Sequence, residues 1–357
     1  MKSREGQSYF PQLDGIRTLA VLMVMVSHWY HGKSLPLLYY GGAMGVGLFF
    51  VLSGFLITHI LLGQQESFLK GSADIRKGIL RTFYLRRTLR IFPIYYLYAG
   101  ILLLLGIGQS REIWAWLLTY TYNIQLFLCN HWHQGYVEHL WSLAIEEQYY
   151  LIWPAMLLFC PPRYHFHLVA CFIFIAIGTK ALLYLQHPAS QFSKFPLCQF
   201  DGFGLGSLLA LFRKRGISIP AAGWGFAFFW GLSFFLKWDR FHFHGMSFLG
   251  QVFPFYFIGC ALLIYLAAEG VKGLPGFLLG NPVSVYLGKI SYGLYLYHLC
   301  IPDLCRWTLK KSGIGLLPEA GMWVFYGATT LLVTSVSWYL IEQPVNRLKD
   351  RFRYSGA

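Results

Sequence analysis

The chain has 357 residues, of which 56% are hydrophobic, 19% aromatic and only 12% charged. An ordinary soluble domain carries about twice that share of charged residues. The formal net charge of +14 would suit a nucleic-acid-binding protein, but the basic residues lie in short stretches between apolar segments, where anionic lipid headgroups are the usual partner. We therefore expect an all-α polytopic membrane bundle, formed by one domain over residues 1–357, and no nucleic-acid partner.

Apolar segments recur along the whole chain and predict the membrane helices. They cover residues 13–30, 43–62, 91–106, 112–128, 140–159, 166–185, 197–212, 220–237, 247–268, 283–304 and 320–341. Four regions rich in Lys and Arg separate them: Lys2 with Arg4, the loop 64–90, residues 213–215 and the basic tail 346–357. Short basic regions remain on the inner side of a membrane, so we place all four in the cytoplasm.

The number of spans follows from this orientation. Two cytoplasmic regions must be separated by an even number of spans, yet five segments lie between 91 and 212. We predict that 112–128, which is rich in Thr, Tyr, Asn and Gln, is re-entrant or interfacial; the short segment 197–212, which holds Asp201, is the alternative. The result is about ten spans with both termini in the cytoplasm.

The first span carries two polar residues, Arg17 and His28, whose burial in a membrane costs free energy. Eleven residues make about three turns, so both side chains share one face, roughly 16 Å apart along the axis. Such residues inside a membrane usually mark a functional site. In the alternative interpretation, Arg17 extends to the headgroups and His28 caps the far end. The predicted topology places Arg17 near the inner face and His28 in the outer half.

The next two spans add a hydroxyl group and an arginine cluster. The stretch GVGLFFVLSGFLIT brings Ser53 to mid-depth, with glycines that allow close helix contact. Arg87 and Arg90 are three residues apart on one helical face, with Arg86 beside them. Anchoring of the topology is the ordinary role of such a cluster. A clamp for phosphate groups is the competing interpretation, because guanidinium groups suit phosphate oxygens.

Two carboxylates and further histidines follow. Glu146 and Glu147 lie inside the predicted span 140–159, so we expect partners for them, such as Arg17, His28 or His139, or else a purely structural ion pair. Tyr295 and His298 are three residues apart on the predicted span 283–304 and should share a face. Three His-x-His pairs lack a third ligand at fixed spacing, so we predict no metal.

Several ordered motifs together resemble the integral membrane acyltransferase-three family, which contains bacterial surface-glycan O-acetyltransferases. The motifs are LDGIR with its Arg-x10-His spacing, GVGLFFVLSGFLI, RTLR, WSLAIEEQYYL, ISYGLYLYH and the closing IEQP. The family's catalytic histidine matches His28, and its partner arginine matches Arg17. Its paired arginines match Arg87 and Arg90, and its membrane glutamate matches Glu146.

The resemblance implies a reaction and a place for it. An acyl group, usually acetyl, passes from cytoplasmic acetyl-CoA to a hydroxyl of a cell-surface polysaccharide, such as lipopolysaccharide O-antigen, on the outer side of the bacterial inner membrane. The expected partners are acetyl-CoA as donor substrate, a glycan or lipid-linked sugar acceptor and membrane lipids, with no permanently bound cofactor. Many members carry an Asp where this chain has Gly47. The role of that Asp in orienting a polar partner is therefore either absent here or supplied elsewhere, with Asp14 as a candidate.

The residue chemistry agrees with this reaction. Transfer to an alcohol needs a general base near neutrality, which His28 supplies, and a cationic site for the donor's phosphates, for which we choose Arg86, Arg87 and Arg90. Six more residues are supporting candidates: Glu147, Asp14, Ser53, His139, His298 and Tyr295. A covalent acyl-enzyme on Ser53 or His28 stays open. The alternative function is a secondary transporter or flippase for a glycan or lipid, although the internal repeats typical of transporters are not evident.

Overall fold

The computed structural model describes residues 9–30, 36–64, 73–131, 135–187, 190–242, 247–352 and 354. Across these residues the chain is helical and contains no strand, which confirms the all-α prediction. Lys2, Arg4 and Arg353, which belong to the predicted cytoplasmic regions, lie outside the described residues.

The helices occupy most of the chain. In the first half they are α1 (Pro11–Trp29), α2 (Pro36–Gly63), α4 (Ala73–Leu105), α5 (Trp114–Leu118), α6 (Tyr122–Cys129), α7 (Leu140–Phe159) and α8 (His165–Gln186). In the second half they are α9 (Phe200–Lys214), α10 (Ala222–His242), α11 (Ser247–Val252), α12 (Phe255–Glu269), α13 (Gly273–Gly280), α14 (Pro282–Lys289), α15 (Ser291–Tyr297), α16 (Ile301–Lys311), α17 (Glu319–Ser337) and α18 (Gln343–Arg347). A π-helix, Trp338–Glu342, joins α17 to α18, and a 3₁₀ turn, Leu348–Arg351, follows.

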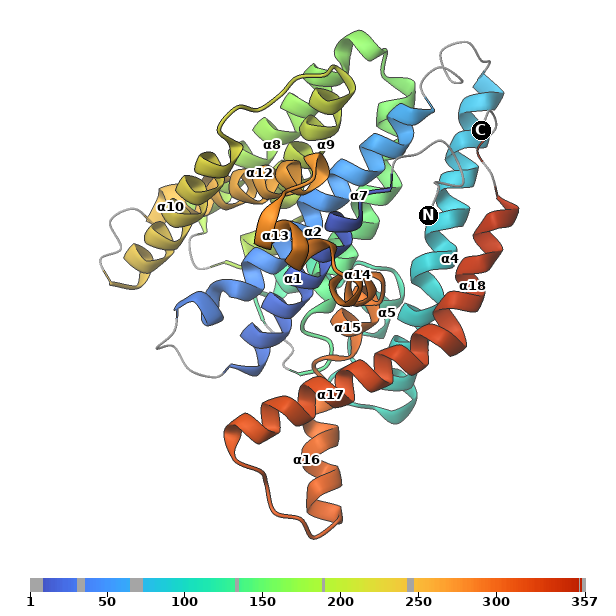
Figure 1. Cartoon of the computed structure of the whole chain (residues 1–357), viewed down its shortest axis with the longest axis vertical. Coiled ribbons are helices and arrows are strands. Elements are labelled where there is room, and N and C mark those ends of the chain that lie inside the picture. The colour runs from blue at the N-terminus through green and yellow to red at the C-terminus, as the bar shows by residue number, and fades with distance from the viewer. Residues whose placement is uncertain are drawn as a thin grey trace.

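The helices that carry the polar motifs lie in the middle of the molecule. In Figure 1, α1, α2 and α7 pass through the centre, α8, α10 and α12 cover one side, and α4 with α18 covers the other. The short helices α14 and α15 lie between these groups, and α16 protrudes at one end. Helices α1, α2, α4, α7 and α15, which carry the catalytic candidates, are therefore packed against one another.

Glycines set how closely the central helices pack. A Cβ at Gly54 of α2 would lie 2.1 Å from the Phe203 carbonyl oxygen, and one at Gly206 of α9 would lie 2.0 Å from the Val51 oxygen. Only a residue without a side chain allows two backbones to approach this closely. Packing of α2 against α9 therefore explains Gly54, the last glycine of the GVGLFFVLSGFLIT motif.

We expect the substitution Gly206→Ala to destabilise the protein, because the added methyl group meets backbone atoms that have no room to move. Overpacking of this kind costs about 1–3 kcal/mol. The midpoint of thermal unfolding in detergent measures the loss. The matched control is Gly178→Ala in α8, where, among the described residues and apart from the backbone of α8 itself, no atom lies within 4 Å of an added Cβ. Equal midpoints for both variants would contradict the packing argument.

Several predicted spans match observed helices closely. The segments 13–30, 140–159 and 166–185 correspond to α1, α7 and α8. The segment 112–128 forms only α5 and α6, separated near Tyr120, whose φ is 53°. Neither piece has the roughly 20 residues that a crossing helix needs. This is consistent with the prediction that 112–128 does not span. The alternative segment, 197–212, forms α9 of only 15 residues, so the choice between the two stays a prediction.

Three predictions were wrong about continuity. The segment 283–304 is not one helix: it breaks into α14, α15 and the start of α16, where Pro302 occupies the first turn. The segment 247–268 breaks before α12 at Pro254, which lacks a backbone N–H to donate. The predicted loop 64–90 is helical from Ala73 onward, so its basic residues lie on the first half of α4.

The described helices contain several candidates for membrane crossing. Four are long and apolar enough: Tyr40–Gly63, Asp74–Leu105, Pro162–Gln186 and Glu319–Arg351. A fifth arises if α12 and α13, bent by 87° at their junction, are one broken span. The chain is therefore a helical membrane protein, whereas the count of ten spans and the orientation of the termini stay predictions.

Candidate functional site

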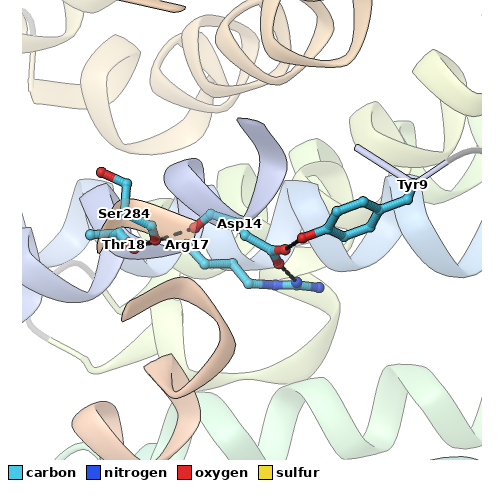
Figure 2. A network of polar contacts seen from close by, with 5 residues as sticks. All are labelled: Tyr9, Asp14, Arg17, Thr18 and Ser284. Carbon is cyan, nitrogen blue, oxygen red and sulfur yellow. Dashed lines mark hydrogen bonds and ion pairs between the residues drawn. The ribbon is translucent and has the colours of Figure 1, made fainter. Parts of the chain in front are cut away.

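Arg17 is held by a network at the start of α1 (Figure 2). Its Nη1 donates to Oδ1 of Asp14 at 2.6 Å, and the hydroxyl of Tyr9 donates to Oδ2 at 2.7 Å. Thr18 Oγ1 donates to the carbonyl oxygen of Ser284 at 2.6 Å, which ties α1 to α14. The Arg17 side chain is 19% exposed and paired with the buried Asp14, so Arg17 is held in place by this network.

A cavity of about 70 Å³ lies between α1, α2, α4, α7 and α15. Its polar lining comes from Arg17, Ser53, Arg87, Arg90, Ser142, Glu146, Glu147, Tyr150, Ser291, Tyr292 and Tyr295, and its apolar lining mainly from α2. We call it the central cavity. It brings Arg17 of the first span, both paired arginines and both glutamates to one place, although they are far apart in the sequence.

Glu146 makes its contacts deep in this cavity. Ser53 Oγ donates to Glu146 Oε1 at 2.8 Å and lies 2.8 Å from the Tyr150 hydroxyl. The Arg87 guanidinium lies over the Tyr150 ring, 4.8 Å from its centroid. Tyr150 was missed in the sequence, although its place four residues after Glu146 puts both on one face of α7. The site therefore couples a carboxylate, two hydroxyls and an arginine.

The expectation that Glu146 partners His28 or His139 was wrong. His139 immediately precedes α7, and Glu146 follows seven residues later. Two turns separate them by roughly 10 Å along the helix axis. Glu146 therefore belongs to the arginine side of the central cavity, and a different group must position His28.

His28 lies in a cluster of three histidines. Its Nδ1 is 2.7 Å from Nε2 of His298, and the two rings stack with centroids 4.9 Å apart. The ring of His139 meets that of His298 edge-on at 5.1 Å. His298 is fully buried, and Trp29 Nε1 donates to its carbonyl oxygen at 3.0 Å. The break between α15 and α16 places His298 in this cluster.

The hydrogen bonds determine which nitrogen of His28 is free. A carbonyl oxygen only accepts, so His298 Nδ1, at 2.6 Å from the Tyr295 oxygen, must donate. A neutral imidazole has a single N–H, so Nε2 of His298 accepts from Nδ1 of His28. Nε2 of His28 then carries the lone pair. This is the tautomer that a general base requires.

Tyr295 and Ser142 connect the two regions. Their hydroxyls lie 2.6 Å apart, and the Tyr295 hydroxyl donates to the carbonyl oxygen of His139 at 3.1 Å. Both residues also line the central cavity. The central cavity therefore adjoins the histidine cluster through Tyr295 and Ser142, and Arg17, Arg87 and Arg90 also line it.

Arg86 does not join this site. Its Nη1 donates to the carbonyl oxygen of Phe352 at 2.9 Å, and its guanidinium lies over the ring of Tyr354. Arg86 therefore anchors the C-terminal residues to α4 rather than lining the cavity. Glu147 does line it, and it also faces a groove between α4, α5 and α7.

Comparison with known proteins identifies the family. The family model described as an acyltransferase domain, the acyltransferase-three family, matches residues 10–342. The chain belongs to this family. It is 27% identical to the peptidoglycan O-acetyltransferase OatA of Listeria monocytogenes, over 97% of this chain and 57% of that protein. It is 25% identical to the putative peptidoglycan O-acetyltransferase YrhL of Bacillus subtilis, over 94% of this chain and 55% of that protein.

The relatives are longer than this chain. The O-acetyltransferase OatA of Staphylococcus aureus is 25% identical over 95% of this chain and 57% of its own length. The chain thus spans a little over half the length of the curated relatives it matches. No solved structure is similar to it.

The structure explains one departure from the acyltransferase-three pattern. A Cβ at Gly47 would lie 2.6 Å from Cε2 of Tyr256, so the ring of Tyr256 fills the space that an Asp side chain would need. Asp14, expected as a replacement, is bonded to Arg17 and Tyr9 on α1. It orients the family's arginine rather than occupying the second-span position.

We expect Glu146→Gln to lower kcat by about tenfold or more, because hydrogen bonds to charged groups are worth about 1.5–3 kcal/mol. Glu147→Gln should cost less, since among the described residues no hydrogen bond or ion pair of its carboxylate is present, whereas Ser53 donates to Glu146. Acetyl transfer by purified variants at matched protein level measures the difference. Equal and negligible losses would contradict the role given to Glu146.

Proposed function

We propose that the protein is an O-acetyltransferase that passes an acetyl group from cytoplasmic acetyl-CoA to a hydroxyl of a cell-surface glycan. The observation that supports this most is that the cationic cavity adjoins the histidine cluster. Arg87, Arg90 and Tyr295 line the central cavity, and the backbone oxygen of Tyr295 accepts from His298, the hydrogen-bond partner of His28. A cationic entrance suits the donor's phosphates, and a free imidazole nitrogen suits the acceptor's hydroxyl.

The proposed chemical step is direct transfer. Nε2 of His28 removes the proton from the acceptor hydroxyl, and the oxygen attacks the thioester carbonyl carbon. A C–O bond forms, the C–S bond breaks, and the CoA thiolate leaves and takes up a proton. Transfer through an acyl-Ser53 intermediate is the alternative, because Glu146 accepts the hydrogen bond of Ser53.

The proposed topology places the donor and the acceptor on opposite sides. We place both termini and the start of α4 in the cytoplasm, with about ten crossings and 112–128 as the non-spanning segment, in the bacterial inner membrane. The ends of α4 and α18 that carry the basic residues lie toward one end of the molecule, and α16 protrudes at the other (Figure 1). Arg17 and His28, about 16 Å apart on α1, then serve opposite sides.

The acceptor class follows from the family. The relatives in Listeria and Bacillus are named for peptidoglycan, and lipopolysaccharide O-antigen is another acceptor of the same class. Both are cell-surface glycans with free hydroxyls. Mass spectrometry of each glycan from cells with and without the protein identifies the acetylated one.

The function is tested with purified protein in proteoliposomes, acetyl-CoA and a soluble glycan fragment. We expect ester-linked acetyl on the fragment and one equivalent of free CoA thiol for each ester formed. Movement of the fragment across the membrane without acetylation would overturn the proposal in favour of a transporter or flippase.

The paired arginines are expected to act on donor binding. The double substitution Arg87→Gln with Arg90→Gln should raise the apparent KM for acetyl-CoA by about tenfold or more, because charge-assisted bonds to phosphate are lost. The KM for the acceptor should change little. The matched control replaces two exposed cations earlier on α4, Lys77 and Arg81, with Gln. Similar KM values for acetyl-CoA in both double variants would show that Arg87 and Arg90 only fix the orientation of the protein in the membrane.

A further inference from the structure

A second cavity, of about 220 Å³, lies beside the central cavity. We call it the basic cavity. Arg17, Arg90 and Tyr292 line both cavities, so the two are neighbours with a shared boundary. The remaining lining comes from Tyr9, Asp14, Lys289, Trp338, Glu342, Asn346 and Lys349. Helices α1, α4, α14 and α15 and the C-terminal residues thus all contribute.

The charges around the basic cavity are poorly compensated. Asp14 is already bonded to Arg17. Over the part of the chain that the structure describes, neither Arg90, Lys289 nor Lys349 makes a hydrogen bond or an ion pair. Glu342 also lines the cavity, but the only side chain to which it bonds in that part is Ser337, at 3.5 Å. The lining therefore holds four cations, Arg17, Arg90, Lys289 and Lys349, against two carboxylates, Asp14 and Glu342. This excess of positive charge favours an anion between the cations.

A buried acceptor also faces this region. Oδ1 of Asn346, a residue that lines the basic cavity, is buried and has no hydrogen-bond partner among the described residues. Buried polar atoms are normally satisfied by protein, water or ligand. An amide oxygen suits a hydroxyl or N–H group next to a bound anion. A phosphorylated nucleoside offers both an anion and such donors.

We propose that the basic cavity is a subsite for a phosphate monoester of the donor nucleotide, with Lys289 and Lys349 as ligands beside Arg90. The proposal rests on the proposed function, because the bound phosphate is that of acetyl-CoA. The thioester arm of the same molecule then extends into the central cavity past Arg17 and Arg90. An anionic lipid headgroup has the same phosphate chemistry. The shared boundary with the central cavity favours the donor.

The test compares CoA with 3′-dephospho-CoA, which lacks the phosphate monoester, by calorimetry on the purified full-length protein. We expect the wild-type protein to bind CoA at least about tenfold more tightly, the value of one charge-assisted contact. The double substitution Lys289→Gln with Lys349→Gln should abolish this preference. Lys289→Arg with Lys349→Arg should retain it, which separates loss of charge from misfolding.

A matched control makes the same change in net charge at two lysines outside both cavities. Lys272 and Lys310 are exposed and line neither cavity, so replacing both with Gln should leave the preference for CoA intact. A wild-type protein that binds both compounds equally, or a Lys289 and Lys349 double variant that keeps the preference, would overturn the subsite. If the Lys289 and Lys349 double variant binds CoA and 3′-dephospho-CoA more weakly by the same factor, the subsite is also overturned. Such a result would mean that the two lysines act only through the overall positive charge of the protein.

The lipid alternative and the proposed function have separate outcomes. If native mass spectrometry shows that the double variant loses bound phosphatidylglycerol while its preference for CoA persists, the cavity is a lipid site and the proposal is wrong. If the wild-type protein binds CoA without preference, only the subsite fails. If it does not bind CoA at all, the proposed function fails as well.

Discussion

Replacing His28 with Ala should abolish acetyl transfer while leaving donor binding largely intact. Nε2 of His28 is the lone-pair nitrogen left by the hydrogen bonds to His298 and Tyr295. A positioned general base is worth about 10² to 10⁴ in rate, so kcat should fall by at least about 10²-fold. His28 does not line the central cavity, which explains why the affinity for acetyl-CoA should be preserved.

Two measurements check this expectation. Calorimetry with CoA reports binding, and ester formation on a glycan fragment reports transfer. Arg17→Ala is the complementary variant on the same helix: because Arg17 lines both cavities, it should weaken donor binding. A His28→Ala protein that folds, binds CoA and acetylates at a rate near wild type would defeat the mechanism.

The second large effect concerns His298, which we regard as a positioning residue for His28. His298→Leu removes the acceptor that holds Nδ1–H of His28, so the imidazole is free to adopt the other tautomer or to rotate. We expect kcat to fall by about 10²-fold, with the KM for acetyl-CoA unchanged. A residue that acts only in packing would lower the protein level instead of separating kcat from KM.

Two conservative variants sharpen the test. His298→Gln places an amide oxygen near the position of Nε2 and should recover part of kcat. His298→Asn instead imitates the Nδ1 side, which donates to Tyr295, and should recover little. Equal activity of the two variants would contradict the assignment of the tautomer.

The sequence predicted the elements and the family well, because both depend on local patterns. Apolar segment length identified α1, α7 and α8, and the ordered motifs identified the family; the roles of Arg17, His28 and Glu146 stay predictions. Breaks inside apolar runs were not predicted, since Pro254 and Pro302 interrupt segments whose hydropathy is continuous. The break before α16 matters most, because it places His298 against His28.

The partners within the site were harder to predict. Spacing along one helix placed Glu146 and Tyr150 on a common face of α7, but only packing of α2 against α7 shows that Ser53 bonds to Glu146. In the same way, Arg86 and Arg87 are neighbours in sequence, yet Arg86 turns to the C-terminal residues and Arg87 to the cavity. Side-chain direction depends on contacts between distant segments, which a single sequence does not encode visibly.

The central claim is that the acetyl group crosses from the arginine side of the bundle to the His28 side. The direct measurement uses sealed proteoliposomes in which a glycan fragment is trapped inside and labelled acetyl-CoA is added outside. For protein inserted with the start of α4 outward, established by protease access to that region, we predict labelled ester on the trapped glycan and none with His28→Ala. Labelled ester that forms only when glycan and acetyl-CoA share one side of the membrane would contradict the account.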